Sequence, residues 1–213
     1  MTKRAFFVSF EGGDGCGKTT QMRLLLERLR SQGKDVLETA EPGGTPIGRQ
    51  IRRILLDSAN DALSPRAEML LYFACRAQNV DEWIRPALAA GRIVVSDRFT
   101  DSTLAYQGEG RGLTAQLVRE LHAIACQEIL PDLTIYLDID YRTGLARARA
   151  RNAEQDGPDE SRMEAQAEEF HERVRRGYLA LAAAEPARIR TIDARQSVEA
   201  VAAAIWAEVQ PHV

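Results

Sequence analysis

Five short apolar segments alternate with longer stretches of helical periodicity along the 213-residue chain. The apolar segments lie at 5–10, 35–41, 92–98, 133–139 and 188–193. AFFVSF is a nearly continuous apolar run, which is typical of a parallel strand that is covered on both faces. Strands that alternate with helices predict βαβ units and a mainly parallel sheet. The pattern therefore predicts an α/β fold with five strands.

The segments between these strands carry helix start and stop residues. TTQMRLLLERLRSQG has leucines at helical spacing and ends at Gly33, a common helix stop. A further helix is predicted over about 46–57. Ser64 and Pro65 suit the cap and the first position of a long helix, in which Pro86 either causes a kink or starts another helix. SVEAVAAAIWAEV is predicted to be the last helix.

Polar clusters follow four of the predicted strands, at 11–20, 41–45, 97–107 and 193–195. Ligands of parallel sheets bind beyond the carboxyl ends of the strands. These clusters are therefore expected at the ligand-binding edge of the sheet, whatever motif each of them carries.

The first cluster, EGGDGCGKTT, matches the phosphate-binding pattern G-x-x-x-x-G-K-[ST] between a predicted strand and a predicted helix. Its glycines allow the backbone N–H groups to surround phosphate oxygens at a helix N-terminus. Lys18 can reach the β- and γ-phosphates, and the Thr19 hydroxyl can bind Mg²⁺. The predicted ATP-binding residues are Gly12, Gly13, Asp14, Gly15, Cys16, Gly17, Lys18, Thr19 and Thr20.

Several classes of protein share such a loop. GTPases carry an N-K-x-D motif and ABC-type ATPases carry L-S-G-G-Q, and neither motif is present in this sequence. Helicases and motor proteins are usually longer. A compact kinase that phosphorylates a small acceptor is the class that the sequence favours.

The cluster after the third strand, SDRFTDSTLAYQGEGRG, carries candidate metal and acceptor groups. Asp97 at the strand end can hold the water shell of Mg²⁺. Neighbouring side chains of an extended chain point in opposite directions, so Arg98 can face an acceptor phosphate while Asp97 faces the metal. A surface Asp–Arg pair is the alternative. Polar and aromatic groups follow that suit a partly aromatic ligand, or else form a helix cap and a half-buried tyrosine: Ser102, Thr103, Tyr106 and Gln107.

Asp14 places a carboxylate inside a loop whose chemistry favours bound anions. An acceptor nucleotide must lie next to this loop, and a carboxylate turned toward the acceptor can accept a hydrogen bond from a ribose hydroxyl. The alternative is a turn-favouring aspartate that faces solvent.

An arginine-rich segment, YRTGLARARARN, precedes the polar stretch AEQDGPDES. On a helix, Arg147 and Arg151 share one face, and Arg162 begins the next predicted helix. Basic residues on both sides of a flexible loop predict a mobile lid at about 150–162 that brings arginines to the transferring phosphoryl group. A solvated face with intrahelical ion pairs is the alternative.

Composition and charge narrow the range of partners. A net charge of −3 gives no basic field for nucleic acid. No apolar run approaches the roughly 20 residues that span a bilayer. Cys16, Cys75 and Cys126 are far apart, which fits a reducing compartment and no structural zinc site. We therefore expect a single domain over 1–213 in the cytoplasm, without nucleic-acid or membrane partners.

Several blocks of the sequence carry a resemblance to a known family. EGGDGCGKTT, AEPGGTPIG, LLYFACRAQ, VVSDRFTDSTLAYQGEGRG, LPDLTIYLDI and ARARARN, spread from about residue 5 to residue 194, resemble the thymidylate kinase family. The resemblance implies a three-layer P-loop NTPase fold with a five-stranded parallel sheet, and a homodimer. It also implies Mg²⁺-assisted transfer of the γ-phosphate of ATP to dTMP, giving dTDP.

The same resemblance assigns roles to individual residues. Phe73 would stack on thymine, unless it is an ordinary core aromatic, and Arg76 would reach the thymine O4. Tyr106 would crowd the 2′ position, and Asp14 would accept a hydrogen bond from the 3′-OH. The implied substrate-binding residues are Asp14, Glu41, Pro42, Phe73, Arg76, Arg98, Ser102, Thr103, Tyr106 and Gln107. The implied catalytic residues are Lys18, Arg98, Arg151 and Arg162, and the metal ligands are Thr19 and Asp97.

The sequence departs from the family pattern at two positions. Ala40 stands where bacterial relatives often have arginine, and Ser161 stands where many have aspartate. The loop at Gly15 and Cys16 lacks the arginine of some members, so the resemblance assigns the catalytic arginine to the lid. Two rivals stay open, namely a kinase for another small acceptor and a nucleotide-binding interaction module without turnover.

Overall fold

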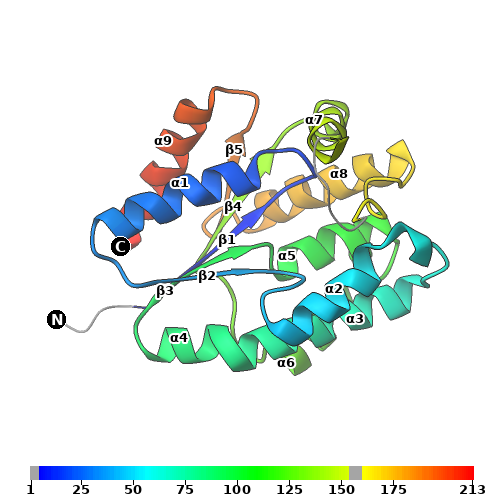
Figure 1. The fold of residues 1–213 in the computed structure, drawn as a ribbon, viewed down its shortest axis with the longest axis horizontal. Coiled ribbons are helices and arrows are strands. Elements are labelled where there is room, and N and C mark those ends of the chain that lie inside the picture. Colours follow the sequence, from blue (N-terminus) through cyan, green and yellow to red (C-terminus); the bar gives the residue numbers. More distant parts are fainter. Residues whose placement is uncertain (1–4, 154–159) are drawn as a thin grey trace.

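Five parallel strands form one sheet in the computed structural model, which describes residues 5–153 and 160–213 (Figure 1). The strands are β1 (Phe6–Glu11), β2 (Val36–Ala40), β3 (Ile93–Asp97), β4 (Leu133–Asp138) and β5 (Ile189–Asp193). Their order across the sheet is β2-β3-β1-β4-β5, and every neighbouring pair is parallel. The predicted strands are confirmed to within one residue at each end, and the parallel order places their carboxyl ends at one edge.

Helices connect the strands. They are α1 (Lys18–Ser31), α2 (Pro46–Leu56), α3 (Pro65–Asn79), α4 (Arg85–Ala89), α5 (Thr100–Thr103), α6 (Ala115–Ala125), α7 (Tyr141–Ala153), α8 (Glu168–Ala184) and α9 (Val198–Val209). Short 3₁₀ segments lie at Ser58–Asn60 and Gln210–His212, and π-helical segments lie at Val80–Ile84 and Leu104–Gly110.

The helix boundaries follow from capping chemistry. The Ser64 hydroxyl accepts a hydrogen bond from the Ala67 amide at the start of α3, as its position before a proline predicts. Gly33 has a φ of 70° just after α1, which confirms it as the helix stop. Pro86 lies in the first turn of α4, so it starts a further helix after the π-helical segment.

The alternation of side chains along β1 divides the core into two layers. Phe6, Val8 and Phe10 pack against α1 and α9, whereas Phe7 packs on the other face against residues of α4 and α6. Helix α8 covers that second face as well, where Tyr178 stacks on Tyr136 of β4 with ring centroids 4.8 Å apart. The result is the predicted three-layer arrangement, with the sheet between two layers of helices (Figure 1).

No helix in the described part of the chain combines the length and the apolar character that crossing a membrane requires. The three cysteines are free and buried.

Candidate active site

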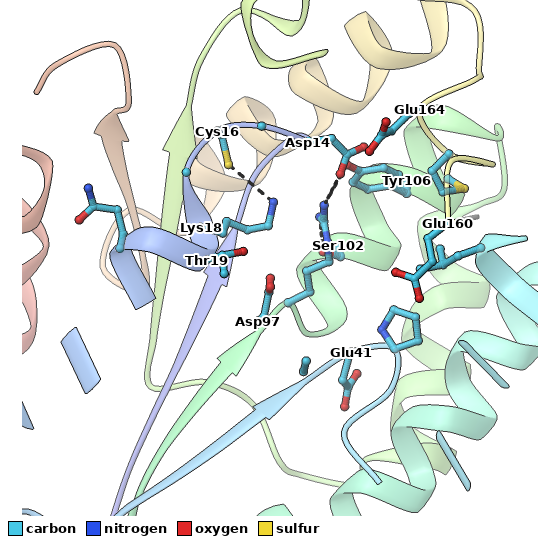
Figure 2. Close-up of a pocket in the computed structure, with 18 of the residues that line it drawn as sticks. Asp14, Cys16, Lys18, Thr19, Glu41, Asp97, Ser102, Tyr106, Glu160 and Glu164 are labelled. Carbon is cyan, nitrogen blue, oxygen red and sulfur yellow. Dashed lines mark hydrogen bonds and ion pairs between the residues drawn. The ribbon is translucent and has the colours of Figure 1, made fainter. Parts of the chain in front are cut away.

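A cavity of about 790 Å³ lies at the carboxyl edge of the sheet (Figure 2). Its walls include residues 14–21 of the loop after β1 and the start of α1, residues 40–42 at the end of β2, Asp97 at the end of β3 with Arg98 after it, and Ala194 after β5. The four polar clusters that follow predicted strands therefore meet at a single cavity, as the parallel order of the strands requires.

The loop after β1 has the form that its glycines predict. Gly15 has a φ of 69°, and a Cβ atom there would lie 2.0 Å from the Gly144 carbonyl oxygen of α7. The loop thus packs backbone to backbone against α7, which leaves its N–H groups at the start of α1. Of the predicted ATP-binding residues, 14–20 line the cavity, whereas Gly12 and Gly13 contribute carbonyl groups that support Lys18.

Lys18 is held above this loop. Its ammonium donates hydrogen bonds to the carbonyl oxygens of Gly12 at 3.1 Å and Gly13 at 2.9 Å, and it lies 3.6 Å from the Cys16 sulfur. Because the side chain is largely buried, its charge is aimed into the cavity before any ligand binds. A fixed cation at a helix N-terminus is what a bound phosphate group needs.

Thr19 and Asp97 offer oxygen atoms to a hard cation. Both line the cavity, and the Asp97 carboxylate points toward Thr19 (Figure 2). The Oδ1 atom of Asp97 is buried and accepts no hydrogen bond from the described part of the protein. Carboxylate and hydroxyl oxygens are suitable Mg²⁺ ligands, and no cluster of three acidic, histidine or cysteine side chains that could hold a metal is found among the described residues. Thr19 and Asp97 therefore suit an Mg²⁺ ion that retains several water ligands and also binds phosphate oxygens.

Arg98 lies on the acceptor side of this cavity. Its backbone has a φ of 70°, so it is not part of an extended chain, and the predicted opposite orientation of neighbouring side chains is wrong: Asp97 and Arg98 line one cavity. The guanidinium donates to Asp14 Oδ1 at 3.1 Å and to the Tyr106 hydroxyl at 3.3 Å. Its other terminal nitrogen donates to the hydroxyl groups of Ser102 and Tyr178, each at 3.2 Å.

Asp14 turns its carboxylate toward Arg98. One carboxylate oxygen accepts the hydrogen bond from Arg98, and the other is buried without a partner among the described residues. In Figure 2 its side chain points toward Tyr106 and away from Lys18. This orientation removes the apparent conflict between a carboxylate and a phosphate-binding loop, because the loop has one side for each charge.

A buried ion pair forms the far wall of the cavity. Arg76 is 1% exposed and donates to the Glu41 carboxylate, to Thr103 Oγ1 at 3.0 Å and to the Phe99 carbonyl at 3.2 Å. Burial raises the pKa of Glu41 above its usual value, although the Arg76 charge acts against this. A buried arginine needs such partners, and they leave it in a single orientation.

Comparison with known proteins identifies the family. The chain matches the sequence model described as "Thymidylate kinase" over residues 10–205. The chain belongs to the thymidylate kinase family. It is 54% identical to a thymidylate kinase of Solidesulfovibrio magneticus over 201 residues, covering 94% of this chain and 96% of that protein. It is 52% identical to one of Geobacter sulfurreducens over 200 residues, covering 94% of both chains.

A solved structure of the family agrees with this assignment. The crystal structure of thymidylate kinase from Ehrlichia chaffeensis has a TM-score of 0.77 and is 32% identical, covering 97% of this chain and 98% of that one. The P-loop NTPase fold expected from the thymidylate kinase resemblance is therefore confirmed. The roles that the resemblance assigned to single residues have to be compared with the geometry of this chain.

The aromatic residue at the acceptor pocket differs from the prediction. Phe73 does not line the cavity but packs in the core against Met69 and Val118, with its ring 5.0 Å from the Arg76 guanidinium carbon. Tyr72 lines the cavity instead. Tyr72 lies four positions before Arg76, and residues at this spacing share one face of a helix. The sequence did not identify Tyr72, because residues three and four positions before Arg76 both lie on the same helix face as Arg76 and spacing alone does not choose between them.

Arg162 also differs from the prediction for a lid arginine. It is 2% exposed, does not line the cavity, and forms an ion pair with Glu68 at 2.8 Å while donating to the Leu55 carbonyl. Glu68 is fully buried and also accepts from Gln107 and Arg111. Burial would raise the pKa of Glu68, but hydrogen bonds from Arg111 and Gln107 outweigh it and lower the pKa. Arg162 therefore forms its ion pair with a buried carboxylate and does not line the cavity.

The other lid residues are placed only in part. Arg151 lies in α7, and residues 154–159 of the predicted lid lie outside the described residues. Arg147, on the same helix, lines the cavity. Across the cavity, Arg52 of α2 binds both carboxylate oxygens of Glu160 at 2.8 and 2.6 Å and donates to the Pro42 carbonyl at 2.9 Å.

Arg52 and Glu160 were missed by sequence reasoning. Arg52 is one of several arginines in RQIRR, and nothing in that pattern separates it from its exposed neighbours. Its position next to the loop after β2 brings an arginine to the turn that follows Ala40, where family members often have one in the chain itself. Arg52 of α2 is therefore available for a contact that an arginine at position 40 would make.

Proposed function

We propose that this protein is a thymidylate kinase that transfers the γ-phosphate of ATP to dTMP, giving dTDP and ADP. The observation that carries the proposal is that a phosphate-binding loop and the acceptor-side arginine Arg98 line one cavity. The names of its relatives, at more than half identity over nearly the whole chain, support the choice of dTMP as acceptor.

The donor would lie along the loop and the start of α1. Loop N–H groups and Lys18 would bind its phosphates, and Gln196 and Val201 line the same cavity. Thr19 and Asp97 would hold Mg²⁺, which in this position neutralises phosphate charge during transfer. The support for this ion is the orphaned Asp97 oxygen beside the Thr19 hydroxyl.

The acceptor would lie between Arg98 and the wall formed by Arg76. Arg98 would bind its phosphate, and Asp14 would accept a hydrogen bond from its 3′-OH. Tyr72 would lie against the base, which Arg76 reaches from one helical turn further along α3. Tyr106 would crowd the 2′ position and so favour deoxyribose.

Catalysis in this arrangement consists mainly of positioning and charge stabilisation. Lys18 and Arg98 both line the cavity in which the phosphoryl group would pass. Arg147 of α7 lines the same space, and Arg151 follows it by four positions on that helix. We infer that these α7 arginines, and not Arg162, stabilise the charge on the transferred oxygens. Closure of a lid at about 150–162 would exclude water that hydrolyses ATP.

A homodimer and a cytoplasmic location stay predictions. The support for the dimer is four exposed apolar residues on helices that pack together, Ile47 and Ile54 of α2, Leu70 of α3 and Ile124 of α6. Sedimentation analysis of the purified chain tests it, with a monomer as the contrary result. The free cysteines are compatible with a reducing compartment.

A coupled assay of ADP release with a panel of nucleoside monophosphates tests the function. We expect turnover with dTMP to exceed turnover with dUMP and dCMP, and Lys18→Ala to set the background. Equal rates across the panel would favour a kinase for another acceptor. ATP binding without dTMP-dependent turnover above the Lys18→Ala background would favour the interaction module.

A further inference from the structure

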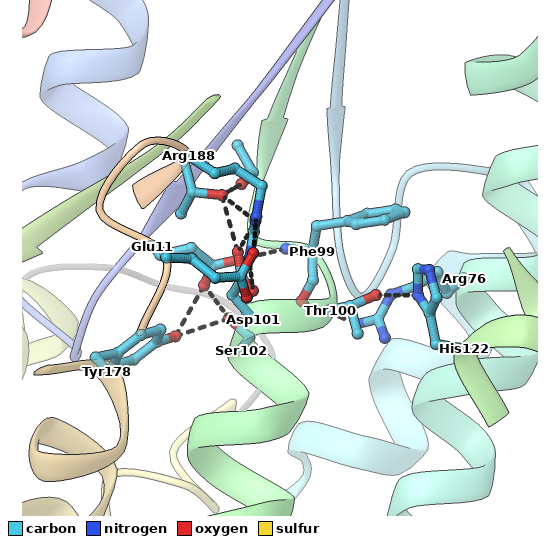
Figure 3. A network of polar contacts seen from close by, with 12 residues as sticks. Glu11, Arg76, Phe99, Thr100, Asp101, Ser102, His122, Tyr178 and Arg188 are labelled. Atoms are coloured by element: carbon cyan, nitrogen blue, oxygen red, sulfur yellow. Dashed lines mark hydrogen bonds and ion pairs between the residues drawn. The ribbon is translucent and has the colours of Figure 1, made fainter. Parts of the chain in front are cut away.

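Glu11 is a fully buried carboxylate beneath the acceptor side of the cavity (Figure 3). It is the last residue of β1, directly before the phosphate-binding loop, but it does not line the cavity. Three donors converge on it: the Phe99 amide at 2.7 Å, the Ser102 hydroxyl and the Tyr178 hydroxyl at 2.8 Å. A buried carboxylate with this many partners is held rigidly.

Two of these donors connect Glu11 to Arg98. The hydroxyl groups of Ser102 and Tyr178 each donate to Glu11 Oε2, and each accepts a hydrogen bond from the same terminal nitrogen of Arg98 at 3.2 Å. Both hydroxyl groups are thereby shared between Glu11 and Arg98, since a hydroxyl proton directed toward the carboxylate leaves the lone pairs of that oxygen for the guanidinium, and the two hydroxyl oxygens also lie 2.9 Å apart. The resemblance assigned Ser102 to substrate binding, but its hydroxyl bridges the Glu11 carboxylate and the Arg98 guanidinium.

The third donor fixes the backbone next to Arg98. Arg98 has a φ of 70°, which is uncommon for a residue other than glycine and persists where the surroundings hold it. Its own amide donates to the Phe10 carbonyl at 2.9 Å, and the next amide, that of Phe99, donates to Glu11 Oε1. The left-handed turn that directs Arg98 into the cavity is therefore anchored to β1 on both sides.

We propose that Glu11 is a positioning residue that holds Arg98, through the Ser102 and Tyr178 hydroxyl groups and the Phe99 amide, in the orientation that binds the acceptor phosphate. The inference rests on the proposed function, since it concerns how dTMP is held. The charged groups that face Glu11 are Arg98 after β3 and Asp101 from α5, and Arg76 of α3 also interacts electrostatically with it. Burial, and then Asp101, raise the pKa of Glu11 to about 7, against the opposing effect of Arg98.

The variant Glu11→Gln tests this role with little change in volume. A glutamine side chain has one acceptor oxygen and one NH₂ group, so it cannot accept from the Phe99 amide on one side and from two hydroxyl groups on the other. Either the turn or the hydroxyl bridge to Arg98 must be lost. We expect kcat/KM for dTMP to fall roughly tenfold to a hundredfold, mainly through KM, as for lost hydrogen bonds to a charged group. The dissociation constant for ATP, measured by calorimetry, stays unchanged.

Asp132→Asn is the matched control. Asp132 accepts a hydrogen bond from the Phe7 amide at 2.8 Å, at the amino end of the same strand and away from the cavity. The same carboxylate-to-amide change there leaves an acceptor for a single donor, so kinetics with both substrates should match the wild type. An unchanged KM for dTMP in folded Glu11→Gln would overturn the inference, as would an equal loss of ATP affinity.

Tyr178→Phe provides a second test that keeps the stack of this ring on Tyr136. It removes one of the two bridging hydroxyl groups, so we expect a smaller loss of the same kind, confined to dTMP. In the double variant Glu11→Gln/Tyr178→Phe the losses should be less than additive, because both changes break one network. Full additivity would overturn the inference.

A pH profile separates positioning from a merely structural role. The ratio of kcat/KM for dTMP between wild type and Glu11→Gln should grow from about pH 6 to about pH 8, as Glu11 becomes ionised. A constant ratio would count against the inference. Normal dTMP turnover in wild type together with normal kinetics in Glu11→Gln would refute the inference alone, whereas absent turnover in wild type would refute the proposed function.

Discussion

The two sides of the cavity are built in different ways. The donor side is one continuous segment of chain, in which backbone groups of a glycine-rich loop and a single lysine supply the binding chemistry. The acceptor side is assembled from side chains that follow β2 and β3 and from side chains of α3, α5 and α8. Arg98, its central residue, contacts Asp14 and Tyr178, which lie 84 and 80 positions away in the sequence.

This difference determines how each side responds to change. A backbone site tolerates many side-chain replacements around it, because N–H groups do not depend on residue type. A site made of side chains depends on every contact that orients them, including contacts with residues outside the cavity such as Tyr178 and Glu11. Variants should therefore separate cleanly into donor-side and acceptor-side effects.

The largest separation is expected for Arg98→Ala. Removing this charge should lower kcat/KM for dTMP roughly a hundredfold or more, because Asp14 is left without its ion-pair partner and the acceptor phosphate loses its cation. ATP affinity should be nearly intact. Initial-rate kinetics and calorimetry check this, with Arg23→Ala, an exposed arginine of α1 that pairs with Glu27, as the control. A loss of ATP affinity as large as the loss for dTMP would contradict the acceptor-side assignment.

Replacing the adjacent aromatic residues Tyr72 and Phe73 of α3 should have two different kinds of effect, one on substrate binding and one on stability. Phe73→Ala should lower the free energy of unfolding by about 3–5 kcal/mol, because it opens a cavity in the core beside Val118. Tyr72→Ala should raise the KM for dTMP more than Phe73→Ala does, at a smaller cost in stability. Denaturant unfolding and steady-state kinetics on both variants measure this. The reverse pattern would return the base-stacking role to Phe73.

The donor side and the strands could be predicted from sequence because their signals are local. The central strands β1, β3 and β4 are apolar runs buried on both faces, and the loop motif needs only its own glycines and Lys18. Most residues of the acceptor side could be predicted from the sequence, but the contacts that they make could not. Arg162 was assigned to the lid because its partner, Glu68 on α3, lies 94 positions earlier, and no local pattern pairs them.

Two further acceptor-side details needed the tertiary structure. The spacings from Tyr72 and Phe73 to Arg76 both fit one helical face, and packing against Val118 of α6 decides which ring is in the core. Because the backbone turns at Arg98 with a positive φ, side-chain directions could not be predicted from an extended chain. Glu11, which anchors this turn, belongs to a strand whose sequence resembles any other core strand. These residues act through contacts that sequence spacing does not contain.

The pH dependence of stability offers a test of Glu11 without substrates. Its pKa is raised from 4.5 to about 7 in the folded protein, so its stabilising contribution is complete below about pH 4.5 and is lost as the pH rises toward 7. The difference in unfolding free energy between wild type and Glu11→Gln should therefore shift by about 2–3 kcal/mol across this range, against the wild type as pH rises. Urea denaturation at a series of pH values measures it, and a constant difference would contradict the buried, raised glutamate.

The smallest expected effect concerns the residue at which the two sides meet. Asp14 belongs to the donor loop by sequence, but its side chain bonds to Arg98. Asp14→Asn keeps an oxygen for that hydrogen bond and removes the charge. The binding of dTMP should therefore weaken roughly tenfold, while ATP binding is preserved or slightly improved. Kinetics with dTMP, and with a 3′-deoxy analogue of dTMP, measure the effect. If the carboxylate binds the 3′-OH, Asp14→Asn should leave the analogue unaffected, because that substrate has no group for it to bind. Equal loss for both substrates would mean that Asp14 acts only through Arg98, and unchanged kinetics with dTMP would assign the residue to the loop alone.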